Sequence, residues 1–156
     1  MSEVTNTAGE TGLVIQLPAD KLGENASAQE QTLERLRHLL DARASLFIKA
    51  TGADQLDVSI EDGKIGFAWW NQLPPFDDIP LLSELCAALV GYAAKVQRVT
   101  TKPAKPVVNE KYAMRSLLYR IGLSGKDHKQ VRQLLLGRLD GNSAWKTPPD
   151  TSGEHL

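Results

Sequence analysis

The side chains best suited to chemistry in this sequence are the basic ones between Glu110 and Lys146. This stretch has three acidic residues and eight basic ones, namely Lys111, Arg115, Arg120, Lys126, Lys129, Arg132, Arg138 and Lys146. The whole chain of 156 residues is nearly neutral, with a formal net charge of −1. Because lysine and arginine bind phosphate, this local excess of positive charge indicates contact with nucleic acid. A solvated basic face without a ligand is the alternative.

The first part of the stretch predicts an amphipathic helix. Its apolar stripe consists of Ala113, Met114, Leu117, Leu118 and Ile121. The opposite face carries Tyr112, Arg115, Ser116 and Tyr119, at helical positions i, i+3, i+4 and i+7. An arginine between two tyrosines suits base stacking and phosphate pairing. The alternative is that the tyrosines pack against the rest of the protein.

The second part predicts another helix, which would bury Val131, Leu134, Leu135 and Leu139. Its outward face carries Lys126, Lys129, Gln130 and Gln133. Lysine can reach guanine edges and glutamine adenine edges, and these residues lie in the first half of the helix, where recognition helices contact bases. The short turn "GLS" fits a helix-turn-helix, but it also fits any helical hairpin. The candidate nucleic-acid-binding residues are Arg115, Tyr119, Arg120, Lys126, Lys129, Gln130, Arg132, Gln133 and Lys146.

Charge divides the chain into two parts. Residues 1–96 hold seven basic and fourteen acidic residues, a net charge of −7, and residues 97–147 hold eleven and three, a net charge of +8. Either the basic part binds an anionic partner, with DNA favoured over RNA, or the two parts dock on each other. The acidic part offers a second hypothesis, a protein-interaction surface formed by Trp70, Pro75 and Phe76, in which Trp70 is expected to leave the apolar strand face.

Catalytic and metal sites have little support in the sequence. The three histidines are far apart and have no ligand-like neighbours, and neither a glycine-rich phosphate loop nor a nucleophile motif occurs. We therefore expect a non-enzymatic protein without a metal or cofactor. The single cysteine, Cys86, lies in an apolar run and is expected to be buried. With no signal-peptide pattern at the start and no apolar run of about eighteen residues, we expect a cytoplasmic protein that does not enter a membrane.

The elements around these residues predict an α+β fold. "LDVSIEDGKIGFAWW" predicts an antiparallel hairpin around an Asp62-Gly63 turn, with Glu61 opposite Lys64 and Val58 opposite Phe67. A strand at 13–17, a helix at 28–51 ending before Gly52, and a helix at about 79–97 capped by Asp77 or Asp78 complete a two-layer β-α-β-β-α sandwich.

The predicted organisation has five parts. Residues 1–12 form a flexible tail, 13–98 the sandwich domain, 99–108 a linker rich in proline and lysine, 109–147 the basic helical hairpin, and 148–156 a second flexible tail. In the hairpin, Asn109 would cap the first helix, Gly122 would end it, and Ser124 with Asp127 would form a capping box for the second helix. A helix-turn-helix protein usually acts as a homodimer, although no heptad pattern indicates one here.

The chain resembles a family of small "virulence-related" proteins encoded on integrative and conjugative elements of gut Firmicutes and their relatives. The resemblance runs from about Ala28 to Lys146 and depends on "IEDGKIGFAWW", "KYAMR", "RIGLSG" and "LDGNSAWK". It implies an accessory or cargo protein of a mobile element in a bacterial cytoplasm, serving DNA transfer, its regulation, or evasion of host defence. It implies no active-site residues.

Overall fold

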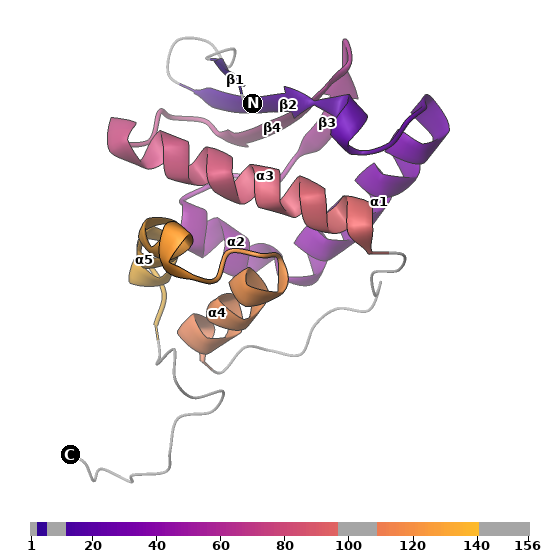
Figure 1. The fold of residues 1–156 in the computed structure, drawn as a ribbon. Helices are drawn as coiled ribbons and strands as arrows, with labels where there is room; N and C mark the ends of the chain where they lie inside the picture. The colour runs from indigo at the N-terminus through magenta and orange to yellow at the C-terminus, as the bar shows by residue number, and fades with distance from the viewer. Residues whose placement is uncertain (1–2, 6–11, 97–108, 141–156) are drawn as a thin grey trace, which may run out of the picture.

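The computed structural model describes residues 3–5, 12–96 and 109–140, and these have a mixed α+β fold (Figure 1). Four strands form one antiparallel sheet in the order β1-β2-β4-β3, comprising β1 (Glu3–Thr5), β2 (Leu13–Pro18), β3 (Val58–Glu61) and β4 (Lys64–Trp70). The helices lie on one side of this sheet, and they are α1 (Ala26–Ala42), α2 (Ala44–Thr51), α3 (Ile79–Lys95), α4 (Glu110–Arg120) and α5 (Lys129–Gly137). The predicted α+β class is confirmed.

The hairpin of β3 and β4 has the predicted register. Glu61 pairs with Lys64, Ile60 with Ile65, and Val58 with Phe67. Asp62 and Gly63 both have positive φ, 53° and 75°, as the two-residue turn requires. Strand β3 begins at Val58, and in the segment before it the N–H groups of Asp54 and Gln55 donate to the carbonyl of Trp69.

The other side of β4 contains an irregularity that the sequence did not indicate. Ile15 pairs with Phe67, but Leu13 pairs with Trp70, so β4 spans one residue more than β2 between these pairs. Such a bulge breaks the alternation of side chains, and Trp70 therefore faces inward beside its partner Leu13. The expectation that Trp70 leaves the apolar face is wrong, since its side chain is buried and its indole Nε1 donates to the carbonyl of Thr51 at 3.1 Å.

The N-terminal residues contribute a strand where a flexible tail was expected. Glu3, Val4 and Thr5 pair with Gln16, Ile15 and Val14, so that β1 covers the free edge of β2. Antiparallel pairing satisfies backbone groups that an exposed edge would leave open.

The predicted helix at 28–51 is two helices. Asn25 caps α1, its side chain accepting from the N–H of Ala28 at 2.9 Å. At Arg43 the backbone leaves helical geometry, with φ −132° and ψ 34°, although neither proline nor glycine is present. The break is linked to packing, because α1 contacts α3 whereas α2 contacts α5. Gly52 ends α2 as predicted, in the left-handed conformation with φ 74°.

The predicted aspartate cap of α3 is wrong. A 3₁₀ turn, η2 (Phe76–Asp78), leads directly into α3, and Asp78 has helical φ and ψ without a capping hydrogen bond. Its carboxylate instead forms an ion pair with Arg138 beyond α5, at 3.6 Å. Pro80 lies in the first turn of α3, where the absence of its N–H costs nothing.

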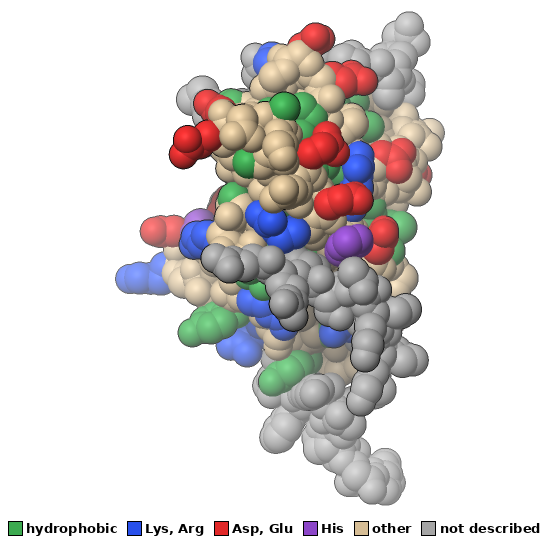
Figure 2. Space-filling model, turned by 90° about the vertical axis from the view of Figure 1, so that its right-hand side faces the viewer, with side chains coloured by type: hydrophobic (Ala, Val, Ile, Leu, Met, Phe, Trp, Pro, Cys, Tyr) green, Lys and Arg blue, Asp and Glu red, His purple; other side chains and the backbone are tan. Residues whose placement is uncertain are grey.

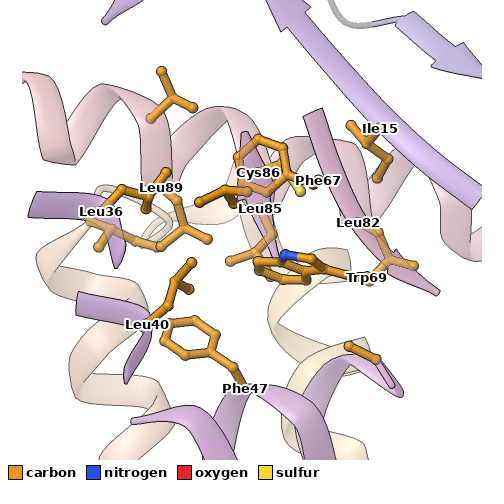
Figure 3. Packing of buried hydrophobic residues seen from close by; sticks show 14 of the residues in the cluster. Ile15, Leu36, Leu40, Phe47, Phe67, Trp69, Leu82, Leu85, Cys86 and Leu89 are labelled. Atoms are coloured by element: carbon orange, nitrogen blue, oxygen red, sulfur yellow. The ribbon is translucent and has the colours of Figure 1, made fainter. Parts of the chain in front are cut away.

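One hydrophobic core joins the sheet to the five α-helices of the described residues. Trp69 lies at its centre, with its ring centroid 5.5 Å from that of Phe67 and 6.5 Å from that of Phe47 (Figure 3). Cys86 is fully buried beside these rings as predicted, and its burial raises the pKa of the thiol. The α4 and α5 helices lie on the side of α3 away from the sheet (Figure 1), and their buried side chains, such as Leu118 and Leu135, belong to the same core. The core thus includes helices at more than one distance from the sheet.

Candidate nucleic-acid interface

The turn between α4 and α5 is closed by backbone hydrogen bonds. Asn109 caps α4 as predicted, accepting from the N–H of Tyr112 at 3.1 Å. At the other end, the N–H of Leu123 donates to the carbonyl of Leu118 at 2.8 Å, and that of Gly122 to the carbonyl of Tyr119 at 3.2 Å. These two bonds form a Schellman motif around Gly122, whose φ is 95°. Gly122 therefore ends α4 as predicted and turns the chain back along it.

The start of α5 differs from the prediction. Ser124 and Asp127 form no capping box; the chain passes through Gly125, with φ 93°, into a 3₁₀ turn, η3 (Lys126–His128), and then into α5. Because the hydroxyl of Ser124 does not cap a helix, it can contribute to the surface between α4 and α5.

A groove of about 500 Å³ lies where this turn meets α4 and α5. It is lined by Arg115, Ser116, Tyr119, Ser124, Gly125 and Arg132, and we call it the α4–α5 groove. Its size falls in the range of about 300–1,000 Å³ that is typical of small-ligand sites. The lining has two guanidinium groups, two hydroxyl groups and a phenol, and none of the six residues is acidic. Such a surface suits an anion.

The guanidinium of Arg132 is fixed by the turn. Its Nη1 donates to the carbonyl of Leu123 at 3.0 Å and to that of Gly125 at 2.7 Å. Among the described residues these are its only hydrogen bonds, so its Nε and Nη2 keep their donors for a ligand. A guanidinium that is already oriented loses less freedom when it binds an oxyanion.

Tyr119 and Arg115 form the α4 side of the groove. They are four residues apart, one helical turn, and both are exposed. The Tyr119 side chain is 73% exposed, so the alternative that it packs against the rest of the protein is wrong. Tyr112 is half-buried and lies outside the lining of the groove. Of the two tyrosines and the arginine on the predicted stacking face, Tyr119 and Arg115 therefore line the groove and Tyr112 does not.

The remaining predicted residues are distributed around this site. Exposed positions on η3 and α5 are held by Lys126, Lys129, Gln130 and Gln133, and Arg120 is exposed on α4 without lining the groove. Lys146 lies outside the described residues. Sequence reasoning missed Ser124 and Gly125 as groove residues, and the only signal for them was the second glycine of "GLSG".

Besides the shared core, three contacts between charged or titratable side chains of the described residues tie this helical pair to the rest of the molecule. Lys49 of α2 binds Glu110 at 2.9 Å and Asp140 at 3.0 Å, and Glu110 also accepts from the N–H of Asp140 at 2.9 Å. That N–H, followed by Lys49, lowers the pKa of Glu110, and the two carboxylates raise the pKa of Lys49. The others are the Arg138–Asp78 ion pair and a contact between His128 Nδ1 and the carboxylate of Glu84 on α3. The two parts of the chain therefore do dock on each other, but through few of their charges.

The basic residues of this part that form no ion pair lie on the surface of the helical pair and the turn between the helices. Among the described residues, no acidic partner lies within ion-pair distance of Arg115, Arg120, Lys126, Lys129 or Arg132. Figure 2 shows the division on one face, with mostly acidic side chains over the upper part and mostly basic ones over the lower part, where two hydrophobic side chains project among them.

Two candidate protein-contact residues, Pro75 and Phe76, lie in the acidic part where the loop after β4 enters η2. Pro75 is exposed, Phe76 is 82% exposed, and neighbouring Leu73 is 49% exposed. Trp70 is buried and is therefore removed from this set.

Comparisons with protein-family models, with curated proteins and with solved structures give no match for this chain. The resemblance to the "virulence-related" proteins therefore stays a prediction. Within the described residues, none of the helices is long and apolar enough to cross a membrane, and no three His, Cys, Asp or Glu side chains gather as a metal site would require.

Proposed function

We propose that this chain is a non-enzymatic nucleic-acid-binding protein that contacts phosphates through α4, α5 and the turn between them. The observation that carries the proposal is the α4–α5 groove, which is lined by Arg115 and Arg132 together with exposed Tyr119. Arginine pairs with phosphate in a bidentate manner, and an adjacent aromatic ring can stack on a base.

The way the charges are used supports the proposal. Two of the three acidic residues between 110 and 146, Glu110 and Asp140, are paired with Lys49. This pairing neutralises negative charge that would repel a phosphate backbone, and the exposed cations then dominate the surface around the groove.

A more specific form of this proposal is that α4 and α5 bind duplex DNA as a helix-turn-helix. In that mode α5 would enter the major groove of a duplex and present Lys129, Gln130 and Gln133, all of which are exposed. A homodimer would then be expected, because such proteins usually read paired half-sites.

The biological setting follows from the sequence resemblance. We propose an accessory protein of a bacterial mobile genetic element that acts in the cytoplasm, with DNA favoured over RNA as its ligand. Enzymatic activity, a metal and a cofactor form no part of this proposal.

The test is fluorescence anisotropy with labelled DNA and RNA, single-stranded and duplex, across a salt series. A triple variant, Arg115→Gln/Lys126→Gln/Lys129→Gln, removes three exposed cations from the helical pair. If each contacts one phosphate, the log–log salt slope should shrink by about two to three units. The matched control, Lys21→Gln/Arg43→Gln/Lys95→Gln, removes the same charge from the acidic part and should bind like the wild type. Equal weakening by both variants, or no binding by the wild type at low salt, would overturn the proposal.

A second candidate function is a protein-interaction module, for example an inhibitor of a host defence complex. The observation that favours it is the exposure of Leu73 and Phe76 in the acidic part of the molecule. A large exposed aromatic residue is a common anchor in protein interfaces. A partner that is captured by the wild type, and lost with Phe76→Ser but kept with Tyr119→Leu, would support this function.

A further inference from the structure

The shape of the α4–α5 groove restricts the kind of nucleic acid that fits it. A volume of about 500 Å³ suits a ligand of small-molecule size rather than the width of a double helix. The groove lies between α4 and the turn before η3, whereas the residues that would read a duplex lie on the outward face of α5. The groove lining and the duplex-reading residues are thus two different sets on the same helical pair.

The aromatic residue of the groove favours an unpaired base. In a duplex, base pairs stack on one another and present only their edges to a protein, whereas a single strand also presents the faces of its bases. Tyr119 is 73% exposed at the groove, with its ring available to such a face. It is one turn along α4 from Arg115, so base and phosphate contacts would come from the same helix face.

The other side of the groove is organised for a phosphate. The carbonyls of Leu123 and Gly125 hold Nη1 of Arg132, which orients the guanidinium plane. Ser116 and Ser124 add hydroxyl donors to the lining. Gly125, with φ 93°, has no side chain to occupy the space beside Arg132, and a Cβ built there would meet nothing within 4 Å.

We propose, on the basis of the proposed function, that the groove binds one unpaired nucleotide of a single strand. The phosphate lies between Arg115 and Arg132, and the base stacks on Tyr119. The protein is then a single-strand binder first, and any duplex contact uses the outward face of α5.

The experiment compares a labelled oligothymidylate of about ten nucleotides, within the site sizes of single-strand-binding modules, with a labelled duplex of the same length. The full chain and three variants, Tyr119→Leu, Tyr119→Phe and Arg115→Ala, are titrated by anisotropy. We expect the wild type to bind the single strand at least about tenfold more tightly than the duplex. Tyr119→Leu should weaken single-strand binding about fivefold to a hundredfold, as expected for loss of a stacking platform, and Tyr119→Phe should retain it.

The salt series separates stacking from charge. Tyr119→Leu should leave the salt slope unchanged, because it removes no cation, whereas Arg115→Ala should lower the slope by about 0.7. If the duplex binds as tightly as the single strand, or if Tyr119→Leu binds the single strand like the wild type, this inference is overturned while the proposed function stands. If the wild type binds neither probe at low salt, both fail. Gln31→Ala, which changes an exposed glutamine on α1 away from the groove, is the matched control, and a loss of single-strand binding in it would also overturn the inference.

Discussion

The two parts of this chain carry opposite net charge, and they use their cations differently. In the acidic part, three cations hold the fold together: Arg35 donates to the carbonyl of Ala93, Arg37 donates to that of Val58, and Lys49 binds two carboxylates. In the basic part, Arg115, Lys126 and Lys129 are exposed and make no ion pair among the described residues. The total number of cations in a segment is therefore a weaker indication of anion binding than the number of cations that make no structural contact.

The two parts share one hydrophobic core, and a substitution in that core has the largest expected effect. Leu135 of α5 is fully buried in the core that also contains Trp69. We expect Leu135→Ala to lower the free energy of unfolding by about 2–5 kcal/mol, because it removes buried methyl groups and leaves a cavity. Gln133→Ala, an exposed change on the same helix, should stay within about 0.5 kcal/mol of the wild type.

The measurement is urea denaturation followed by circular dichroism and by tryptophan fluorescence, in a Trp145→Phe background. The fluorescence then comes from Trp69 and Trp70 in the sheet, far along the chain from the substituted residue. Both signals should shift together. A shift in circular dichroism with an unchanged fluorescence midpoint would mean that α4 and α5 unfold separately from the sheet, as a domain of their own.

A smaller effect is expected from the contact that joins the two parts at Lys49. The pKa of Glu110 lies below its ordinary value of 4.5, so its ionised form stabilises the fold. For a carboxyl group with a lowered pKa, this stabilisation is complete above the ordinary pKa and is lost as the pH falls through the lowered one. We expect Glu110→Gln to be less stable than the wild type at neutral pH, with a difference that shrinks as the pH falls below about 4.5.

Thermal unfolding of both proteins across this pH range measures the difference, with the exposed Glu30→Gln as the control for a lost carboxylate. The pKa of Lys49 is raised above its ordinary value of 10.5, so the same contact should also weaken when the pH rises through the raised value. A difference between wild type and Glu110→Gln that does not depend on pH would show that the fold does not depend on this ion pair.

A structural feature could be predicted from the sequence when the residues that determine it are adjacent in the chain. Features that depend on residues far apart in the chain could not be predicted. The hairpin register follows from two adjacent residues, Asp62 and Gly63, and was predicted correctly. The caps at Asn109 and Gly122 are equally local. The inward turn of Trp70 comes from the pairing of β4 with β2, some fifty residues earlier in the chain, and periodicity within β4 cannot reveal it.

The candidate site divides in the same way. The exposed cations and Tyr119 were predicted from helical spacing on α4 and α5. The groove itself was not predicted, because Ser124 and Gly125 reach it only when the Schellman turn folds back and Arg132 binds two of its carbonyls. Helical periodicity predicts which residues lie on each face of a single helix. A groove between two helices depends on how the turn that joins them folds, and periodicity does not predict this.

The smallest effect is expected from the other exposed aromatic residue, Phe76, and it gives the sharpest contrast with Tyr119. Both rings are exposed, 82% and 73%, but Phe76 is followed by Asp77 and Asp78, whereas Tyr119 lines a groove with two arginines. Negatively charged side chains beside Phe76 repel an anionic ligand, and the arginines beside Tyr119 attract one.

We expect Phe76→Ser to change the free energy of unfolding by no more than about 0.5 kcal/mol and to leave the Kd for single-stranded DNA unchanged. Denaturation and anisotropy on this variant, beside Tyr119→Leu, measure both quantities. Equal loss of DNA binding in the two variants would mean that exposure of an aromatic ring, rather than its position in a groove lined by arginines, determines where the ligand binds.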